Sequence, residues 1–380
     1  MGARILGVGL TGPALTDLER DILRDSTPYA LVLFKRNIES VEQLRDLVRE
    51  IRSIASEPPL IMIDEEGGRV DRLRDLIPGL PGADTFGEGR DSKKLAGWFG
   101  HIVGKALRYF SIDVNLAPVV DLCRDKATKG LERRCFGRDA ATVIDLAGAF
   151  MEGQELEGVG SCLKHFPGIG AGNADPHYGM SVVDLPLSTL IEEDLAPYRA
   201  LGPQAGAVMV GHAIYPQLDD DRLPASLNPK IATDLLRRVV GFEGIVVSDD
   251  MEMHAVSDLA SYEEISVRAL LAGNDVVLFC SHVERVPELM ANIRERAEND
   301  PLLASRYEEA VQRGIVYKRR CTGLQMSSKP LETFEDLMAE VERFQQAFRD
   351  AQPSDGARLD ERRTTPRGGG SGKTGREEWT

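Results

Sequence analysis

The sequence predicts an α/β fold, namely a (β/α)8 barrel of the TIM type, in a single domain with a C-terminal helix and a disordered tail. Eight short apolar runs, rich in β-branched residues, recur along the chain without the polar alternation of a half-exposed strand. Longer amphipathic stretches, typical of helices, alternate with these runs. Eight such units close a barrel, and 380 residues is a usual length for one.

The expected strands occupy residues 4–10, 30–34, 60–64, 114–119, 160–164, 207–211, 244–248 and 275–279. The expected helices occupy residues 16–24, 40–54, 92–109, 140–157, 229–240 and 283–297. Ser40 is expected to cap the second helix, because its hydroxyl can accept a hydrogen bond from a free backbone N–H. The competing fold is an open doubly wound sheet. It would place a G-x-G-x-x-G loop after the first strand, and no such loop follows residues 4–10.

The chain is expected to divide into three parts. The barrel spans residues 1–325, and a helical extension at 326–352 contains an amphipathic helix over residues 331–351. Residues 353–380 are rich in Arg, Asp, Gly, Ser and Thr. Such a segment buries too little apolar surface to offset its ordering entropy, so we expect a disordered tail.

Composition narrows the class of partner. A formal net charge of −15 argues against nucleic acid, because phosphate neutralisation requires a basic face. No apolar run approaches the ~20 residues that span a bilayer, and residues 1–8 lack a signal pattern. The five cysteines are scattered without C-x-x-C spacing, which suggests neither a disulfide framework nor a zinc site. We expect a cytoplasmic monomer or weak homo-oligomer with a small-molecule substrate, and no membrane or nucleic-acid partner.

In barrels of this type the catalytic and substrate-binding residues lie just past the carboxyl ends of the strands. Polar residues follow five of the expected strands, from the third to the seventh. In chain order these residues are Asp64, Asp121, Lys164 with His165, His212, and Asp249 with Asp250.

The strand at 244–248 ends in two aspartates. Asp249 is expected to point into the barrel mouth, where it could act as a nucleophile or an electrostatic stabiliser. Asp250 could equally be the N-cap of a helix over Met251-Glu252-Met253, since acidic residues are favoured there.

The strand at 160–164 opens into a loop rich in glycine. Asp175 and His177 lie there, separated only by Pro176. A carboxylate beside an imidazole raises its pKa and can orient the ring, which suits a general acid/base. A local hydrogen bond within the loop is the other interpretation.

Three further charged residues have a structural alternative. Lys164 could form an internal salt bridge, and His165 could be a core histidine whose hydrogen bonds are satisfied. Arg134 could be a surface charge in a basic run.

Together the motifs resemble those of the bacterial β-N-acetylhexosaminidases of glycoside hydrolase family 3. The resemblance rests on Leu33-Phe34-Lys35-Arg36-Asn37, Asp64-Glu65-Glu66-Gly67-Gly68-Arg69-Val70, Leu116-Ala117-Pro118-Val119-Val120-Asp121-Leu122, Lys164-His165-Phe166-Pro167-Gly168, Pro224-Ala225-Ser226-Leu227, and the run from Gly241 to Met251. The ordered series is more specific than any single motif.

The resemblance implies an enzyme that removes terminal β-linked N-acetylglucosamine with retention of configuration and needs no metal or organic cofactor. It assigns Asp249 as the nucleophile, His177 as the acid/base and Asp175 as its partner. It also implies cytoplasmic action on muropeptide fragments during cell-wall recycling. The residues that it implies for sugar binding are Asp64, Arg72, Arg134, Lys164 and His165.

Two departures from the family pattern concern the loop. Ile169 stands where histidine is usual, and Pro176 stands where serine is usual. Neither departure deletes a catalytic group, but both bear on substrate preference and on loop movement.

Three alternative functions compete with hydrolysis by this mechanism. A glycoside phosphorylase could use the same scaffold, because a histidine acid/base would not repel an anionic phosphate. A metal-dependent barrel hydrolase is disfavoured, because no His-x-His follows the first strand. A non-catalytic sugar-binding relative would be expected to have lost Asp249 or His177, and both are present.

Overall fold

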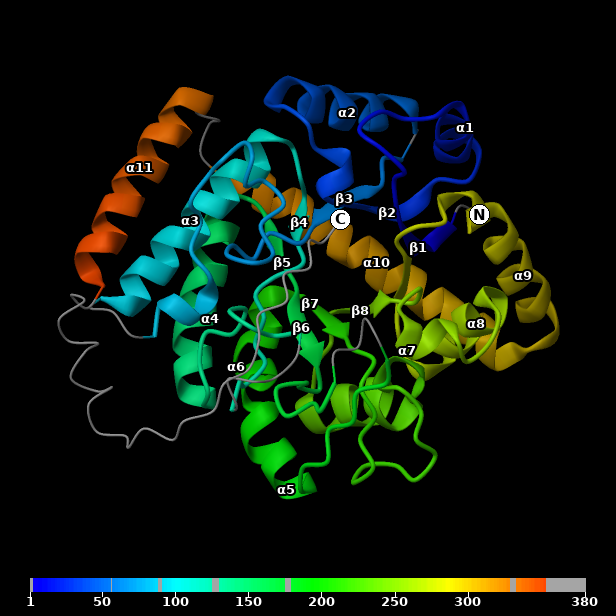
Figure 1. The fold of residues 1–380 in the computed structure, drawn as a ribbon. Helices are drawn as coiled ribbons and strands as arrows, with labels where there is room; N and C mark the ends of the chain where they lie inside the picture. Colours follow the sequence, from blue (N-terminus) through cyan, green and yellow to red (C-terminus); the bar gives the residue numbers. More distant parts are fainter. Residues whose placement is uncertain are drawn as a thin grey trace, which may run out of the picture.

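The strands form a closed parallel barrel (Figure 1). The computed structural model describes residues 3–55, 57–87, 91–124, 130–174, 179–328 and 333–352. Its strands are β1 (Ala3–Gly9), β2 (Pro28–Leu33), β3 (Leu60–Ile63), β4 (Val114–Asn115), β5 (Gly160–Ser161), β6 (Leu163–Phe166), β7 (Ala207–Val210), β8 (Ile245–Asp250) and β9 (Val276–Phe279). They are ordered β5-β4-β3-β2-β1-β9-β8-β7-β6.

The segment from Gly160 to Phe166 closes the barrel. β5 pairs with β4, and β6 pairs with β7 on the other side. Only Cys162 separates these two short strands, so one extended segment joins both edges of the sheet. The segments β5 and β6 therefore share one of eight positions, which confirms the predicted (β/α)8 barrel.

The longer helices surround the barrel. They are α1 (Asp17–Asp25), α2 (Val41–Ile54), α3 (Ser92–Tyr109), α4 (Ala140–Leu156), α6 (Ala196–Ala205), η5 (Lys230–Val240), α8 (Tyr262–Ala272), α9 (Val286–Asn299), α10 (Pro301–Ser327) and α11 (Phe334–Ala351). Ser40 caps α2 as predicted, because its side chain accepts a hydrogen bond from the backbone N–H of Gln43 at 3.1 Å. Among the described residues, no helix is long and apolar enough to cross a membrane.

Three glycines near the first strand do match the spacing G-x-G-x-x-G. Gly7 and Gly9 lie inside β1 rather than after it, and Gly12 follows the strand. A Cβ atom added at Gly9 would lie 2.0 Å from the carbonyl oxygen of Cys280. Gly7 and Gly9 therefore allow close strand packing instead of forming a phosphate-binding loop.

Two apolar cores stabilise the barrel. The inner core contains side chains that point to the barrel axis, including Val32, Met62, Leu116, Cys162 and Met209. A larger outer core lies between the strands and the surrounding helices. Both faces of each strand are thus covered, which explains why the strand sequences are continuously apolar.

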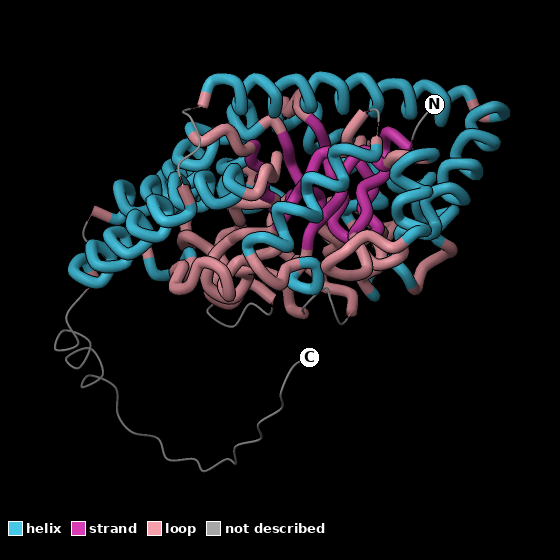
Figure 2. The backbone as a smooth tube through the Cα atoms, turned by 90° about the horizontal axis from the view of Figure 1, so that it is seen from above, coloured by secondary structure: helices cyan, strands magenta, loops and turns pink. Residues whose placement is uncertain are grey.

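Helix α10 closes the amino-terminal end of the barrel. It is one of the helices that the sequence analysis did not predict. The hydroxyl of Tyr317 donates to the carbonyl of Ser161 at 3.2 Å, and Tyr29 donates to Gly314 at 2.9 Å. In Figure 2 a long helix lies along one side of the strands and the loops gather on the other. The carboxyl ends of the strands are therefore the ones left for a site.

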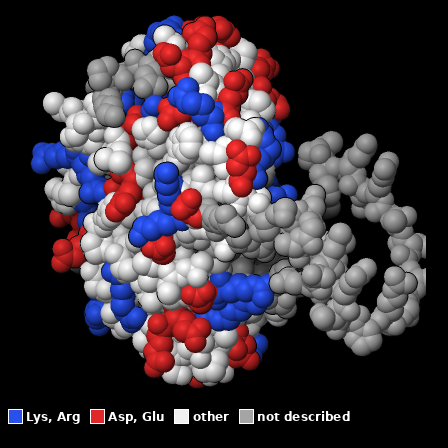
Figure 3. Space-filling view, turned by 90° about the vertical axis from the view of Figure 1, so that its left-hand side faces the viewer, with Lys and Arg blue, Asp and Glu red and all other residues white. Residues whose placement is uncertain are grey.

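Helix α11 packs on α3 and contacts the loop that follows β3. Phe344 contacts both Trp98 and Phe99, and Gln345 donates to the carbonyl of Pro78 at 2.7 Å. Figure 3 shows basic and acidic side chains interspersed over this side of the molecule. The division at residues 325 and 352 stays a prediction, and the expected tail at 353–380 lies outside the described residues.

Helices α3 and α4 approach each other along glycine faces. A Cβ atom at Gly100 would lie 1.9 Å from the carbonyl oxygen of Phe150, and one at Gly153 would lie 2.2 Å from that of Gly97. The neighbour in each case is backbone, which cannot rotate away. This contact requires glycine.

We predict that Gly100→Ala lowers the free energy of unfolding by about 1–3 kcal/mol, because overpacking separates α3 from α4. Gly97→Ala on the same helix is the matched control. Its Cβ would lie 3.6 Å from the nearest atom, so the better helix propensity of alanine should be neutral or stabilising by up to ~1 kcal/mol. Urea unfolding measures both variants, and equal stabilities would contradict the proposed close contact.

Candidate active site

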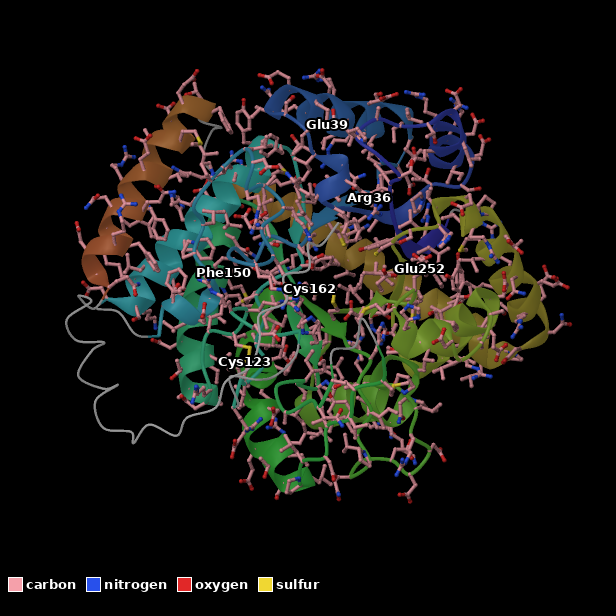
Figure 4. The ribbon with its side chains drawn as sticks, in the orientation of Figure 1. Arg36, Glu39, Cys123, Phe150, Cys162 and Glu252 are labelled. Carbon is pink, nitrogen blue, oxygen red and sulfur yellow. A yellow bond between two sulfur atoms is a disulfide. The ribbon has the colours of Figure 1, made fainter. Side chains whose placement is uncertain are left out.

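A polar cavity opens at the carboxyl end of the barrel. It has a volume of ≈ 240 Å³ and receives side chains from the ends of at least six strands. Its walls contain Val32, Phe34, Asp64, Glu66, Val70, Arg72, Leu116, Arg134, Lys164, His165, Met209, Asp249, Asp250, Met253, Leu278 and Cys280. In Figure 4, Cys162 of the inner core marks the middle of the barrel.

Lys164 on β6 is the centre of a buried ionic network. Its Nζ lies 2.6 Å from Asp64 Oδ1 and 2.6 Å from Glu66 Oε1, and its side chain is 2% exposed. Burial opposes the charged ammonium, but the two carboxylates outweigh that effect and raise the pKa of Lys164. Lys164 therefore stays charged, and the internal salt bridge considered from the sequence does form.

Glu66 connects this lysine to Arg134. The guanidinium of Arg134 forms a fork on Glu66, with Nε and Nη2 each 2.8 Å from a carboxylate oxygen. Burial alone would raise the pKa of Glu66, but the charges of Arg134 and Lys164 hold it well below its usual range. Arg134 is not a surface charge, because its side chain is only 11% exposed.

His165 is held by Asp121. Its Nδ1 lies 2.7 Å from Asp121 Oδ2, and Oδ1 of the same aspartate accepts the backbone N–H of Ile169 at 2.8 Å. Because an ionised carboxylate only accepts hydrogen bonds, Nδ1 carries a proton. The Nε2 atom then faces Arg134 Nη2 at 3.4 Å. Asp121 thus orients the ring of His165 toward the cavity.

Arg72 forms part of the rim. Its side chain is 28% exposed, and Nη2 lies 4.0 Å from Asp64 Oδ2. The guanidinium also lies over the ring of Phe34, 5.6 Å from its centroid. Arg72 is therefore the most exposed of the five residues predicted to bind sugar, but it lines the same cavity as the other four.

The end of β8 presents Asp249 and Asp250 to the cavity. Asp249 Oδ1 accepts the backbone N–H of Asp250 at 2.9 Å. Asp250 Oδ1 accepts the N–H groups of Glu252 at 3.1 Å and Cys280 at 3.2 Å. Burial raises the pKa of Asp250 to about 7.

The helix N-cap role considered for Asp250 is wrong. The short helix α7 (His254–Ser257) begins four residues later, with Met253 at its N-cap. Asp250 instead remains in β8 and fixes the turn to Glu252 and the neighbouring strand β9. A strand-terminal aspartate and a helix cap look alike in sequence, because both accept nearby N–H groups.

Asp175, Pro176 and His177 lie outside the described residues, so their predicted roles stay predictions. The chain on either side of them is held together. Asn173 Oδ1 accepts the backbone N–H of Val182 at 2.9 Å.

The departure at Ile169 lies in a buried position. The isoleucine is 7% exposed and belongs to the outer apolar core, and its backbone contacts Asp121. Ile169 therefore makes an apolar contact at this position.

Sequence reasoning noted Glu66 and Asp121 but assigned them no role. The spacing of Asp64 and Glu66 could have identified Glu66, because residues i and i+2 of an extended segment share a face. Asp121 follows an expected strand, but only the folded chain shows that it holds His165. Among the described residues, no group of three or more His, Cys, Asp or Glu side chains could hold a metal ion.

Cys123 and Cys135 form a disulfide, which the sequence analysis did not expect. Their Cα atoms are 6.0 Å apart, and the other three cysteines are free and buried. The two residues are separated by 12 positions without a motif. Only the folding of the loop after β4 brings them together.

A family model and several known proteins match most of this chain. The model of the glycosyl hydrolase family 3 N-terminal domain matches residues 8–316. The beta-hexosaminidase of Chromobacterium violaceum is 35% identical over 307 residues, covering 79% of this chain and 85% of that protein.

Two similar solved structures cover nearly all of their own chains. The β-N-acetylhexosaminidase of Beutenbergia cavernae has a TM-score of 0.76 and 29% identity, covering 83% of this chain and 97% of its own. NagZ of Neisseria gonorrhoeae, solved with N-trifluoroacetyl-D-glucosamine, has a TM-score of 0.71 and 28% identity. The match covers 90% of this chain and 98% of the NagZ chain.

We predict that Glu66→Gln lowers the free energy of unfolding by about 3 kcal/mol at neutral pH, because it leaves two buried cations under-compensated. The pKa of Glu66 is depressed, so its contribution is present above the unfolded pKa and is lost as pH falls. The deficit should therefore shrink in acid.

Glu132→Gln is the control, because Glu132 is 42% exposed and pairs with Arg69 at the surface. It should cost less than ~1 kcal/mol. Urea unfolding at several pH values compares the two variants. A deficit for Glu66→Gln no larger than that of the control would rule out the ionic network as a stabilising element.

Proposed function

The chain belongs to glycoside hydrolase family 3 and is a glycoside hydrolase, and we propose that it is a retaining exo-β-N-acetylglucosaminidase. The observation that carries this proposal is the placement of Asp249 at a strand end. Its carboxylate faces a cavity that also contains Lys164, Arg134, His165 and Asp64. Such a cavity offers a nucleophile and several hydrogen-bonding groups for a sugar.

Asp249 is proposed to attack the anomeric carbon. A bond forms between its carboxylate oxygen and that carbon while the bond to the glycosidic oxygen breaks, giving a covalent glycosyl-aspartate. Water then displaces the aspartate, so two inversions give net retention. The position of Asp249 on β8 supports this role, because a strand end holds the reacting oxygen more rigidly than a loop tip.

His177 is proposed to donate a proton to the leaving oxygen and later to take one from water, with Asp175 as its partner. The ring must be an imidazolium when it donates this proton and neutral when it takes one from water, and a neighbouring carboxylate favours the imidazolium. The proposal rests on the sequence motif, because both residues lie outside the described part of the chain.

The ionic network is proposed to bind the sugar. Lys164 and Arg134 offer donors, while Asp64 offers acceptors to hydroxyl groups. His165 presents Nε2 to the same cavity, and Arg72 completes the rim. These groups are already held by Glu66 and Asp121, so little reorganisation is required when a sugar binds.

The substrate proposed is a terminal β-linked N-acetylglucosaminide. The natural substrate proposed is a muropeptide fragment from cell-wall recycling. The relatives whose names specify hexosaminidase or N-acetylhexosaminidase activity support this choice. The ligand of the Neisseria gonorrhoeae structure, a glucosamine with a modified N-acyl group, is of the same kind.

We predict that the wild type hydrolyses a chromogenic N-acetyl-β-glucosaminide faster than the corresponding glucoside or galactosaminide. Asp249→Asn should lose about 10³-fold or more in kcat, because the nucleophile is removed. His177→Ala should lose about 10²–10⁴-fold, as expected for a general acid/base. Arg69→Gln, an exposed change, is the control. Near wild-type turnover by Asp249→Asn would refute the mechanism.

The same assay separates the two alternatives that use this scaffold. A phosphorylase would turn over faster in phosphate than in a non-nucleophilic buffer and would release a sugar 1-phosphate. A non-catalytic sugar-binding protein would show no turnover in either buffer. For the proposed hydrolase we expect equal rates and free N-acetylglucosamine in both.

A cytoplasmic location is part of the proposal, since the muropeptide fragments of recycling are processed there. The Cys123–Cys135 disulfide argues for an oxidising compartment instead, because disulfides persist mainly there, so the location requires a direct test. We predict that fractionated cells contain the protein in the cytoplasm, detected by mass spectrometry of each fraction. Recovery of the protein only from outside the cytoplasm would exclude the proposed location.

A further inference from the structure

Glu65 lies between two cavity residues but points away from the cavity. Its side chain is fully buried, and Oε2 accepts the backbone N–H groups of Arg72 at 2.9 Å and Leu73 at 3.0 Å. The side chain of Asn115 on β4 holds the backbone of Glu65 through two hydrogen bonds of 2.9 Å. Glu65 therefore links the rigid barrel to the stretch that carries Arg72.

A second buried carboxyl group contacts Glu65. Asp71 is 7% exposed, and its side chain and that of Glu65 are within hydrogen-bonding contact. Each has one buried oxygen, Glu65 Oε1 and Asp71 Oδ1, with no donor among the described groups. Two ionised carboxylates can only accept hydrogen bonds, so such a contact is unsatisfied unless one group carries a proton.

The charges around the pair favour a retained proton. Burial, followed by the negative charge of Asp71, raises the pKa of Glu65 well above its usual range. Burial also raises the pKa of Asp71, to about 6, although Arg74 and Lys35 oppose that rise. Lys35, on η1 (Lys35–Asn37), is itself paired with the exposed Asp75, which leaves Glu65 without a direct cationic partner among the described residues.

We propose that Glu65 and Asp71 share one proton, and that this protonated pair is a positioning device for Arg72 at the sugar-binding rim. The proton supplies the donor that both buried oxygens lack. It lets Glu65 keep Oε2 directed at the backbone of Arg72 and Leu73. Loss of the proton places two negative charges in contact, which moves Asp71 and the neighbouring Arg72. The inference rests on the proposed role of Arg72 in substrate binding.

The direction of the pH effect follows from the raised pKa values. The stabilisation that the shared proton provides is present at low pH and is lost as pH rises through the folded-state pKa of Glu65. The two groups titrate as a unit. Above about pH 6 the pair has lost one of its two protons and holds the single remaining one. We expect KM for an N-acetyl-β-glucosaminide to rise at alkaline pH, while kcat at saturation changes less.

Glu65→Gln is the decisive variant. Its amide oxygen can accept the N–H groups of Arg72 and Leu73, and its NH₂ can donate to Asp71 at every pH. Its KM should match the wild type at pH 6 and should not rise in alkali. Asp71→Asn should flatten the profile in the same way, because its amide donates to an ionised Glu65. Glu65→Ala should raise KM about tenfold or more at every pH, since Arg72 loses its support.

The control is Asp46→Asn, because Asp46 lies on α2, is 67% exposed and pairs with Arg49 on the same helix. It should keep the wild-type pH profile. A melting-temperature profile against pH provides a readout that needs no activity. The wild type should lose stability relative to Glu65→Gln as pH rises, whereas Asp46→Asn should follow the wild type.

The outcomes separate this inference from the proposed function. Parallel KM profiles and parallel melting profiles for the wild type and Glu65→Gln would overturn the shared proton. Diverging melting profiles with parallel KM profiles would overturn the positioning of Arg72 and leave a purely structural pair. If neither the wild type nor any variant acts on an N-acetyl-β-glucosaminide, the proposed function fails. The melting profiles still decide whether the proton is shared.

Discussion

The contact of one buried ammonium group with two carboxylates determines the shape of the site. Lys164 lies in the segment that closes the barrel, and it meets Asp64 and Glu66 beyond β3. Glu66 extends the network to Arg134 on the loop after β4. Removing a member leaves an uncompensated buried charge, so the three segments are held in one arrangement. Barrel closure and site assembly thus depend on the same residues.

The surroundings of this network make its charges effective. The inner core below it is apolar, and α10 closes the opposite end of the barrel. Charges in such surroundings interact more strongly than charges in water. Held donors and acceptors at the open end therefore suit the recognition of sugar hydroxyls, and the same field acts on the carboxylate of Asp249.

Three successive acidic residues illustrate how one short sequence serves two purposes. Successive side chains of an extended chain point to opposite sides. Asp64 and Glu66 therefore face the cavity, while Glu65 faces Asp71 and the backbone of Arg72. Binding groups and their support come from neighbouring positions. Exposed pairs elsewhere, such as Arg49 with Asp46 on α2, contribute much less.

The sequence by itself determined the barrel, because continuously apolar strands must be covered on both faces and eight of them close on one another. It also placed Asp64, Lys164, His165 and Asp249 at one end, since parallel strands share a direction. Only the tertiary structure decided which charges pair. Glu66 reaches Arg134 across 68 positions, and Asp121 reaches His165 across 44. Such contacts depend on how distant loops pack, and no local pattern of residues records that.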